Sequence, residues 1–242
     1  MKIDYNRIAS EYSQHRRVHP GVLAGLIRLG AIDGNSKVLE VGCGTGNYAV
    51  ALRTLVGCMV WAIDPSQEML SKAKERSGEI NLMLGAAEKL DFPHCFFDLV
   101  FSVDVIHHLS SQLDFFKEAY RVLNNSRKIC TVTDSEWIIR HREPLSVYFP
   151  ETVEIELKRY PRIVELMRIM KQLGFGEIEE TMVEFPYELH DTEAYRDRAF
   201  SSLHLVPKEA FERGIERMEQ DLQHGPIKCV SRYSLLWGTK PS

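Results

Sequence analysis

The chain has 242 residues, of which 44% are hydrophobic and 26% are charged, a composition typical of a folded globular protein. The formal net charge of −4 argues against a protein that binds nucleic acid or an anionic membrane through bulk positive charge. No apolar segment approaches the roughly 18–20 residues of a membrane span, and the N-terminus lacks the apolar core of a signal peptide. The sequence therefore predicts a cytoplasmic protein.

Two helices are predicted ahead of the first strand, over residues 4–14 and 20–29. From residue 37 the chain alternates strands and helices, which predicts a parallel sheet with right-handed crossovers. The predicted strands are apolar at successive positions, as strands covered on both faces require, and they span 37–41, 58–63, 80–84, 97–102 and 129–133. The helices between them span 47–55, 66–76 and 111–123, with Ser66 and Ser111 as N-caps.

The pattern changes after Thr133. Residues 134–160 have no clear period and are interpreted as an insertion. A helix over 162–173, a strand over 177–185, a charged helical segment over 191–223 and a last strand over 232–238 follow. The five cysteines are odd in number and have no C-x-x-C spacing, so free buried thiols are expected, with neither disulfides nor a metal site; they are Cys43, Cys58, Cys95, Cys130 and Cys229.

The segment Val38–Asn47, VLEVGCGTGN, joins the first strand to a helix with glycines at 42, 44 and 46. Glycines permit a tight turn and close approach of a ligand to the backbone. Asp64 stands just after the second strand, where a carboxylate can accept hydrogen bonds from both hydroxyls of a ribose. Together these features predict an adenosine-containing ligand at the C-terminal edge of the sheet.

The spacing favours S-adenosylmethionine over a dinucleotide. A dinucleotide fingerprint needs Gly or Ala where this chain has Asn47. Glu40 precedes the first glycine by two residues; its carboxylate would repel a pyrophosphate but attract a ligand that carries an ammonium and a sulfonium.

The stretches VLEVGCGTG, AIDPSQEML and GAAEKLDFPHCFFDLVFSVDVIHHL resemble the class I S-adenosylmethionine-dependent methyltransferases, and within them the small-molecule, ubiquinone-biosynthesis-like branch (methyltransferase type 11). The resemblance covers roughly residues 5–132. It implies an α/β, Rossmann-like, seven-stranded and mostly parallel sheet with the last strand antiparallel, helices on both faces and helical lid insertions. On this basis residues 1–242 form one domain, with lid helices over 1–30, a cofactor core over 36–133 and substrate-side insertions over 134–160 and 187–226.

The resemblance also implies roles for individual residues. The first loop and the residues near it would hold the methionine and ribose part of the cofactor, Asp64 the ribose hydroxyls, and the next segments the adenine and the sulfonium. A tyrosine and an arginine of the N-terminal stretch would close over the methionine carboxylate. The cofactor residues expected in this way are Tyr12, Arg17, Glu40, Gly42, Cys43, Gly44, Gly46, Asp64, Pro65, Met69, Ala87, Glu88, Ser102 and Asp104.

The chain departs from the family pattern at two places. Ala86 stands where relatives often have an aspartate that reaches the adenine amino group. Asn124–Arg127 replaces a Pro-Gly-Gly turn before the fifth strand; since Asn tolerates a left-handed conformation, the turn is expected to survive.

Methyl transfer depends mainly on positioning, and a general base is needed only when the nucleophile arrives protonated. His107, His108 and Asp134 are the candidate catalytic residues, with packing of one histidine under its loop as the alternative. Glu136, His141 and Tyr148 are weaker candidates. Aromatic residues of the two insertions would either line an apolar or planar substrate pocket or pack the lid; they are Trp137, Tyr148, Phe149, Tyr160, Tyr195 and Phe200.

The preferred hypothesis is an enzyme that moves a methyl group from S-adenosylmethionine to O, N or C of a small molecule. The alternatives are an NAD(P)-dependent oxidoreductase, against which Asn47 and the lack of a Tyr-x-x-x-Lys pair speak, and a catalytically silent module that binds S-adenosylmethionine. A nucleic-acid methyltransferase is disfavoured because no basic stripe is present. The sequence leaves the oligomeric state open.

Overall fold

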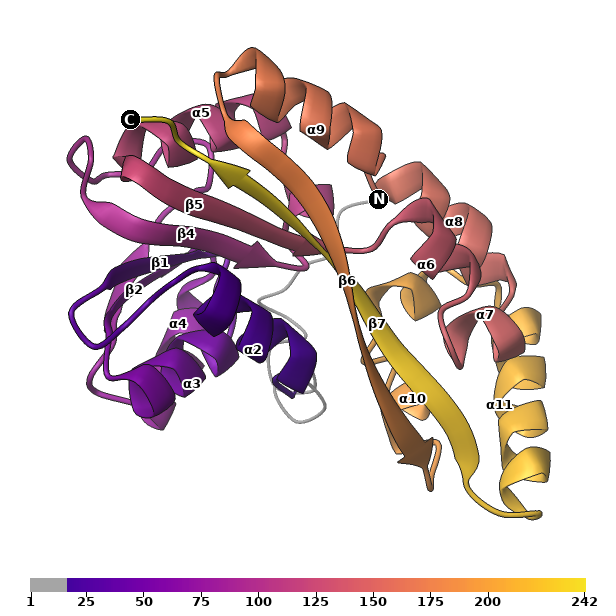
Figure 1. The fold of residues 1–242 in the computed structure, drawn as a ribbon. Coiled ribbons are helices and arrows are strands. Elements are labelled where there is room, and N and C mark those ends of the chain that lie inside the picture. Colours follow the sequence, from indigo (N-terminus) through magenta and orange to yellow (C-terminus); the bar gives the residue numbers. More distant parts are fainter. Residues whose placement is uncertain (1–16) are drawn as a thin grey trace.

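A seven-stranded sheet with the order β3-β2-β1-β4-β5-β7-β6 runs through the computed structural model, which describes residues 17–242 (Figure 1). Strands β1 to β5 are parallel, whereas β7 is antiparallel to both of its neighbours, as predicted. The strands are β1 (Lys37–Val41), β2 (Met59–Asp64), β3 (Asn81–Leu84), β4 (Phe97–Val103), β5 (Leu123–Thr133), β6 (Gly176–Leu189) and β7 (Ile227–Thr239).

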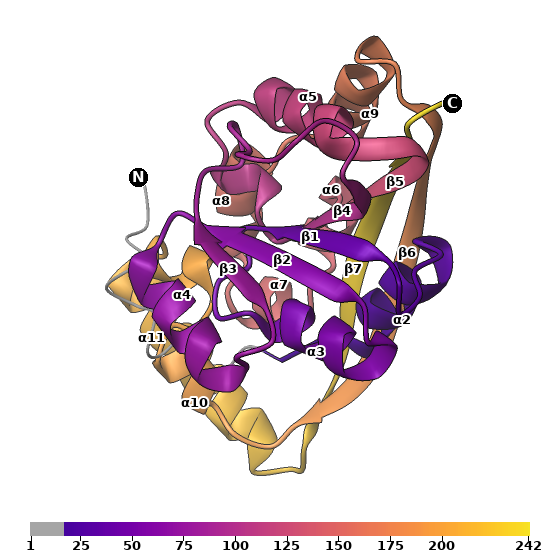
Figure 2. The same cartoon turned by 90° about the vertical axis from the view of Figure 1, so that its left-hand side faces the viewer.

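Helices cover both faces of the sheet because the strands bury alternate residues on opposite sides (Figure 2). Val38 and Leu99 pack on one face with helices α2 (Pro20–Leu29), α3 (Asn47–Val56) and α4 (Gln67–Arg76). Leu39 and Val100 pack on the other face with α5 (Gln112–Val122) and α9 (Ile163–Gln172). The predicted caps are present: Ser66 Oγ accepts from Met69 N at 3.2 Å, and Ser111 Oγ accepts from Asp114 N at 3.1 Å.

Helix α2 differs from the prediction in its place. Its residues were expected within a lid, but Val22 and Leu26 are fully buried in the cluster that also contains Leu235 of β7. Its apolar side packs on the sheet, where α2 contacts β6, β7 and the neighbouring helix α3 (Figure 2). The predicted helix over 4–14 and Tyr12 lie outside the described residues.

Two smaller expectations were wrong. The turn at Asn124–Arg127 is a bulge within β5, since Phe97 pairs with Leu123 and Leu99 with Lys128, and its positive φ of 60° belongs to Ser126 and not to an asparagine. Cys95, at a positive φ of 51°, is exposed, whereas the other four cysteines are buried. No helix of residues 17–242 is long and apolar enough to cross a membrane.

The segments interpreted as insertions form a small helical unit beside the sheet, which we call the cap (Figure 1). Residues 134–160, expected to be irregular, contain three short helices, α6 (Glu136–Arg140), α7 (Leu145–Tyr148) and α8 (Glu151–Arg159). The second segment adds α10 (Glu193–Arg196), the 3₁₀ turn η2 (Ser201–His204) and α11 (Lys208–Leu222). The cap has its own core of apolar side chains: Leu145, Tyr148, Phe149, Tyr195, Leu203, Ile215 and Met218.

The cap is connected to the sheet by β6 and β7, which are longer than the strands beside them. Only Ser234–Thr239 of β7 pairs with β5, whereas β6 and β7 pair with each other from Leu189 and Ile227 onward. Their distal part is thus a two-stranded ribbon that leaves the sheet and runs along the cap (Figure 1).

Candidate active site

Four strands end at the same edge of the sheet, and the residues that follow them surround three connected cavities. The first, which we call the β2 cavity, has a volume of about 240 Å³. It is lined by Gly42 and Gly44 after β1, Asp64–Ser66 and Met69 after β2, Gly85–Glu88 after β3 and Val103–Val105, His108 and Leu109 after β4.

Asp64 is the central polar group of the β2 cavity. Its two oxygens accept hydrogen bonds from Gly44 N at 2.8 Å and from Ser66 N at 2.9 Å, so the carboxylate fixes the first loop against the second. Burial raises the pKa of Asp64, while the two backbone donors lower it. The loop passes close to its neighbours: Gly42 has a φ of 71°, and a Cβ there would lie 2.4 Å from Val105 Cγ2.

The second cavity, the β1 cavity, continues from the first through Gly42, Gly44, Val103 and Asp104. Its further lining comes from Arg17, Glu40, Cys43, Thr45, Asn47, Tyr48 and Tyr233. Glu40 is 2% exposed and accepts from Ala49 N at 2.8 Å. Burial, together with the charge of Asp64, raises its pKa to about 8.

These two cavities suit a ligand with positive charge and hydroxyl groups. Four acidic residues, Glu40, Asp64, Glu88 and Asp104, line them against the single arginine Arg17. Thr45 Oγ1 is buried and has no hydrogen-bond partner among the described residues. An ammonium or sulfonium would relieve the buried negative charge, whereas a pyrophosphate would add to it.

The third cavity, the cap cavity, lies between the strand ends and the cap and has a volume of about 90 Å³. It meets the other two at Asp104, shares His108 with the β2 cavity and shares Tyr233 with the β1 cavity. Tyr233 Oη donates to Asp104 Oδ2 at 3.1 Å. Asp104, at a positive φ of 57°, is thus the residue at which the three cavities join.

Ionised groups dominate the inner wall of the cap cavity. Arg142, which the sequence did not single out, forms an ion pair with Asp134. Burial lowers the pKa of Arg142, but Tyr160, Glu156 and Asp104 raise it by more, so the guanidinium stays charged. Glu156, also missed from the sequence, is 3% exposed and accepts from Arg159 Nη1 at 3.2 Å.

The two histidines lie on the 3₁₀ turn η1 (Ile106–His108) and both line the cap cavity. The His107 ring is half-buried and stacks on Tyr160 with ring centres 3.9 Å apart. His108 is exposed and lies next to it, 3.9 Å between ring centres. His107 is therefore both packed under the loop and part of the cavity wall.

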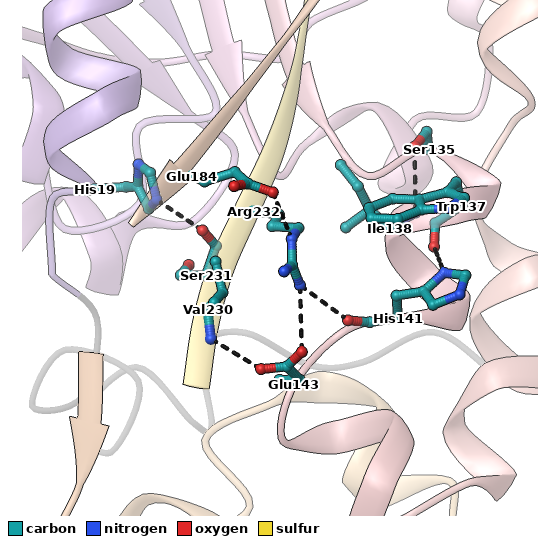
Figure 3. A network of polar contacts seen from close by, with 10 residues as sticks. All are labelled: His19, Ser135, Trp137, Ile138, His141, Glu143, Glu184, Val230, Ser231 and Arg232. Carbon is teal, nitrogen blue, oxygen red and sulfur yellow. Dashed lines mark hydrogen bonds and ion pairs between the residues drawn. The ribbon is translucent and has the colours of Figure 1, made fainter. Parts of the chain in front are cut away.

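Arg232 of β7 ties the ribbon to the loop after α6 (Figure 3). Its guanidinium lies 2.8 Å from Glu184 of β6 and 3.6 Å from Glu143, and it donates to the His141 carbonyl at 3.3 Å. Glu143 in turn accepts from Val230 N at 3.1 Å. This network holds one side of the cap cavity against the sheet.

Residues 39–130 match the model of a methyltransferase domain family. A protein of Encephalitozoon cuniculi named as a methyltransferase is 36% identical over 128 residues, which are 52% of this chain and 57% of that protein. Demethylmenaquinone methyltransferase of a Geobacillus strain is 27% identical over 177 residues, 70% of this chain and 72% of the relative. The chain thus spans little more than half the length of the first relative.

A solved structure shares the fold: phosphoethanolamine N-methyltransferase 2 of Haemonchus contortus, in complex with S-adenosyl-L-methionine. It is 21% identical, covers 98% of this chain and 57% of its own, and has a TM-score of 0.63. Residues 39–130 therefore match a methyltransferase domain, and the chain shares its fold with this methyltransferase. The family match leaves the hypothesis of an NAD(P)-dependent oxidoreductase without support.

Most of the expected cofactor residues line the β2 and β1 cavities, two do not, and Tyr12 lies outside the described residues. Ser102 is fully buried within β4, and Gly46, which caps α3 at a φ of 75°, faces Ala73 of α4. A Cβ at Gly46 would lie 3.0 Å from Ala73 Cβ, so this glycine permits close helix packing. Neither residue lines a cavity described above.

The aromatic residues of the cap differ in what they contact. Tyr160, Tyr195 and Phe200 line the cap cavity, and Tyr195 also belongs to the cap core. Tyr148 and Phe149 belong to the cap core, and Trp137 is 49% exposed and stacks on His141. Of the weaker candidates, Glu136 pairs with Arg162 on the surface and Tyr148 donates to Asp221. Residues 17–242 hold no group of three His, Cys, Asp or Glu side chains that could bind a metal ion.

Proposed function

We propose that the protein transfers a methyl group from S-adenosylmethionine to a small molecule held in the cap cavity. The observation that carries this is the meeting of three cavities at Asp104: two are rich in carboxylates and lie along the first loop, and the third opens toward the cap. The relative from Geobacillus is named for a small-molecule acceptor, which supports the same substrate class here.

We assign the adenosine part to the β2 cavity. Asp64 would accept from the ribose hydroxyls with the lone pairs that Gly44 N and Ser66 N leave open. Pro65 and Met69 would pack against one face of the adenine, and Ala87 and Glu88 would lie along its edge. Ala86 has no polar side chain, so recognition of the adenine amino group falls to backbone atoms of this loop.

We assign the methionine part to the β1 cavity, with Glu40 toward the ammonium and Arg17 toward the carboxylate. We also retain the proposal that Tyr12 is a lid residue that closes over the methionine carboxylate. Asp104 would face the sulfonium, held in position by the hydroxyl of Tyr233 at 3.1 Å. The backbone of Gly42, Cys43 and Gly44 would follow the ligand closely because no side chain intervenes at the two glycines.

When bound, S-adenosylmethionine supplies a methyl group whose bond to sulfur breaks as the acceptor atom bonds to carbon, with the electron pair left on sulfur. The residues of the chain supply alignment and a dry site, which account for most of the rate in such a displacement. His107 or His108 is placed to take a proton from the acceptor, because both line the cap cavity. Asp134, paired with Arg142, would orient the acceptor as a fixed negative charge.

Calorimetry with S-adenosylmethionine and with S-adenosylhomocysteine tests the cofactor half, with binding in the micromolar range expected and no binding at about 1 mM as the contrary result. Release of S-adenosylhomocysteine, measured over a panel of cytoplasmic metabolites, tests the activity. Binding without turnover of any compound would identify a silent binding module instead. We propose that the protein acts in the cytoplasm and not on nucleic acid, which its net charge of −4 favours.

A further inference from the structure

Two buried carboxylates of the cap cavity carry oxygens that nothing in the described chain satisfies. Asp134 is 2% exposed; it is paired with Arg142 through Oδ2, but its Oδ1 has no hydrogen-bond partner. Glu156 is 3% exposed; its Oε1 accepts from Arg159, but its Oε2 has no partner. Buried carboxylate oxygens without donors are costly, so their persistence in the wall of a cavity points to a donor that arrives with the ligand.

The charges around the cavity indicate what kind of donor is missing. Among its aspartates, glutamates and arginines, Asp104, Asp134, Glu143 and Glu156 face Arg142 and Arg232, an excess of two negative charges. Behind this wall, Arg159 pairs with Glu156 and Glu184 pairs with Arg232, and these two charges cancel. One excess charge, that of Asp104, faces the proposed sulfonium. The other belongs to Glu143 and Glu184, which share Arg232, because Arg142 and Arg159 balance Asp134 and Glu156.

We propose that the acceptor substrate is a small amine that binds as a cation, with its ammonium group hydrogen-bonded to Asp134 Oδ1 and Glu156 Oε2. Before transfer the nitrogen gives one proton to His107 or His108; its lone pair then bonds to the methyl carbon, and the electron pair of the broken carbon–sulfur bond stays on sulfur. An ammonium offers three donors, which suits the two unsatisfied oxygens, and one positive charge, which offsets part of the net negative charge of the cavity lining. An anionic substrate would find no free cation, because Arg142 and Arg232 are both engaged by carboxylates. The rings of Tyr160, Tyr195 and Phe200 would contact the carbon frame of the amine.

This inference rests on the proposed function, since it names the substrate class of the same site. Its test uses three matched sets of probes, each with an amine, an alcohol and a carboxylate on one frame. The sets are butylamine, butanol and valerate; 2-phenylethylamine, 2-phenylethanol and 3-phenylpropanoate; and tryptamine, tryptophol and indole-3-propionate. Binding to the protein saturated with S-adenosylhomocysteine is measured by calorimetry and saturation-transfer NMR, and methylation by release of S-adenosylhomocysteine from S-adenosylmethionine.

In at least one set we expect the amine to bind about tenfold or more tightly than the alcohol, and the carboxylate most weakly. Glu156→Gln keeps the shape of the side chain but removes its charge, and it should reduce the preference for the amine about tenfold. Glu154→Gln is the matched control, because Glu154 lies on the same helix but is exposed and lies outside the cavity. Affinity for S-adenosylhomocysteine should stay within about threefold in both variants.

The proposal is overturned if no amine binds at about 5 mM, if alcohols or carboxylates bind as well as amines in every set, or if Glu156→Gln leaves the preference intact. The comparison within the wild-type protein decides the matter even if Glu156→Gln does not fold. Failure of S-adenosylhomocysteine to bind the wild-type protein is a separate result, and it would remove the proposed function itself.

Discussion

The sheet and the cap meet the same requirement, burial of apolar side chains, in different ways. The sheet has two large clusters of apolar side chains, one on each face, and its polar groups stand at the strand ends. The cap has one small cluster made of short helices and presents ionised side chains to its cavity. The difference agrees with the proposed division of work, in which the sheet holds the cofactor and the cap selects the acceptor.

The cap and the sheet are connected at a few identifiable places. The ribbon of β6 and β7 and the contacts of Arg232 connect the two. If the two regions divide the work as we propose, they should be separable by mutation, and four changes test this in order of decreasing effect.

Phe149→Ala should disrupt the cap core. Phe149 is fully buried, stacks on Tyr195 and Phe211, and lies so near Gly214 that a Cβ there would be 2.3 Å from its ring. Loss of the ring should cost about 3–5 kcal/mol of local stability. Hydrogen exchange should become faster in 145–159 and 193–222 while affinity for S-adenosylhomocysteine stays within about threefold.

Phe101→Ala, in the sheet, is the comparison and should impair both the protection of the cap from exchange and the affinity for S-adenosylhomocysteine. Loss of this affinity in Phe149→Ala would show that the two regions are not separable.

Asp64→Ala should weaken binding of the cofactor product and leave the cap intact, which is the reverse of the effect of Phe149→Ala. It removes the carboxylate that binds Gly44 N and Ser66 N and faces the proposed ribose position. We expect affinity for S-adenosylhomocysteine to fall about 100-fold, equivalent to about 3 kcal/mol, with the cap unchanged in hydrogen exchange. Glu75→Ala, which removes an exposed carboxylate of α4, is the control. A change of less than about fivefold would contradict the assignment of Asp64.

Glu40→Gln should change how stability depends on pH. The folded state holds a proton on Glu40 up to about pH 8, whereas the unfolded chain loses it near 4.5. Because the folded state binds more protons between these values, the free energy of unfolding should fall as pH rises through this range and level off above it. From pH 6 to 9 the free energy of unfolding of the wild-type protein without cofactor should fall by at least about 1 kcal/mol more than that of Glu40→Gln. If the free energy of unfolding changed with pH by the same amount in the two proteins, the raised pKa of Glu40 would be contradicted.

Arg232→Met should weaken the connection between the cap and the sheet, and its effect should be the smallest of the four variants. The variant keeps most of the packing of the side chain but loses its contacts with Glu184, Glu143 and the His141 carbonyl. We expect a loss of about 1 kcal/mol and faster hydrogen exchange in 136–148 and 227–233, with unchanged affinity for S-adenosylhomocysteine. Arg168→Met, on the outer helix α9, provides the comparison. Equal exchange in the two variants would show that the network does not hold the cap.

The sequence by itself determined the sheet, the first loop and the cofactor. Buried parallel strands are apolar at successive positions, and the loop needs glycines and carboxylates at fixed spacings, so these signals are local. The strand starting at Lys37 and the helix over Pro20–Leu29 were predicted to the residue. The longest strands, β6 and β7, were predicted too short, because the distal ribbon has no second face to bury and its pattern of apolar residues is weak.

Only the tertiary structure decided the cap and its cavity. Its helices have four to nine residues in α6, α7, α8 and α10, too few for a period to show in the sequence. Arg142 and Glu156 are separated along the chain and resemble ordinary charged residues of a solvated surface. They become a site only because the cap folds them against Asp134 at the end of β5, where burial gives each charge a cost that a partner must offset.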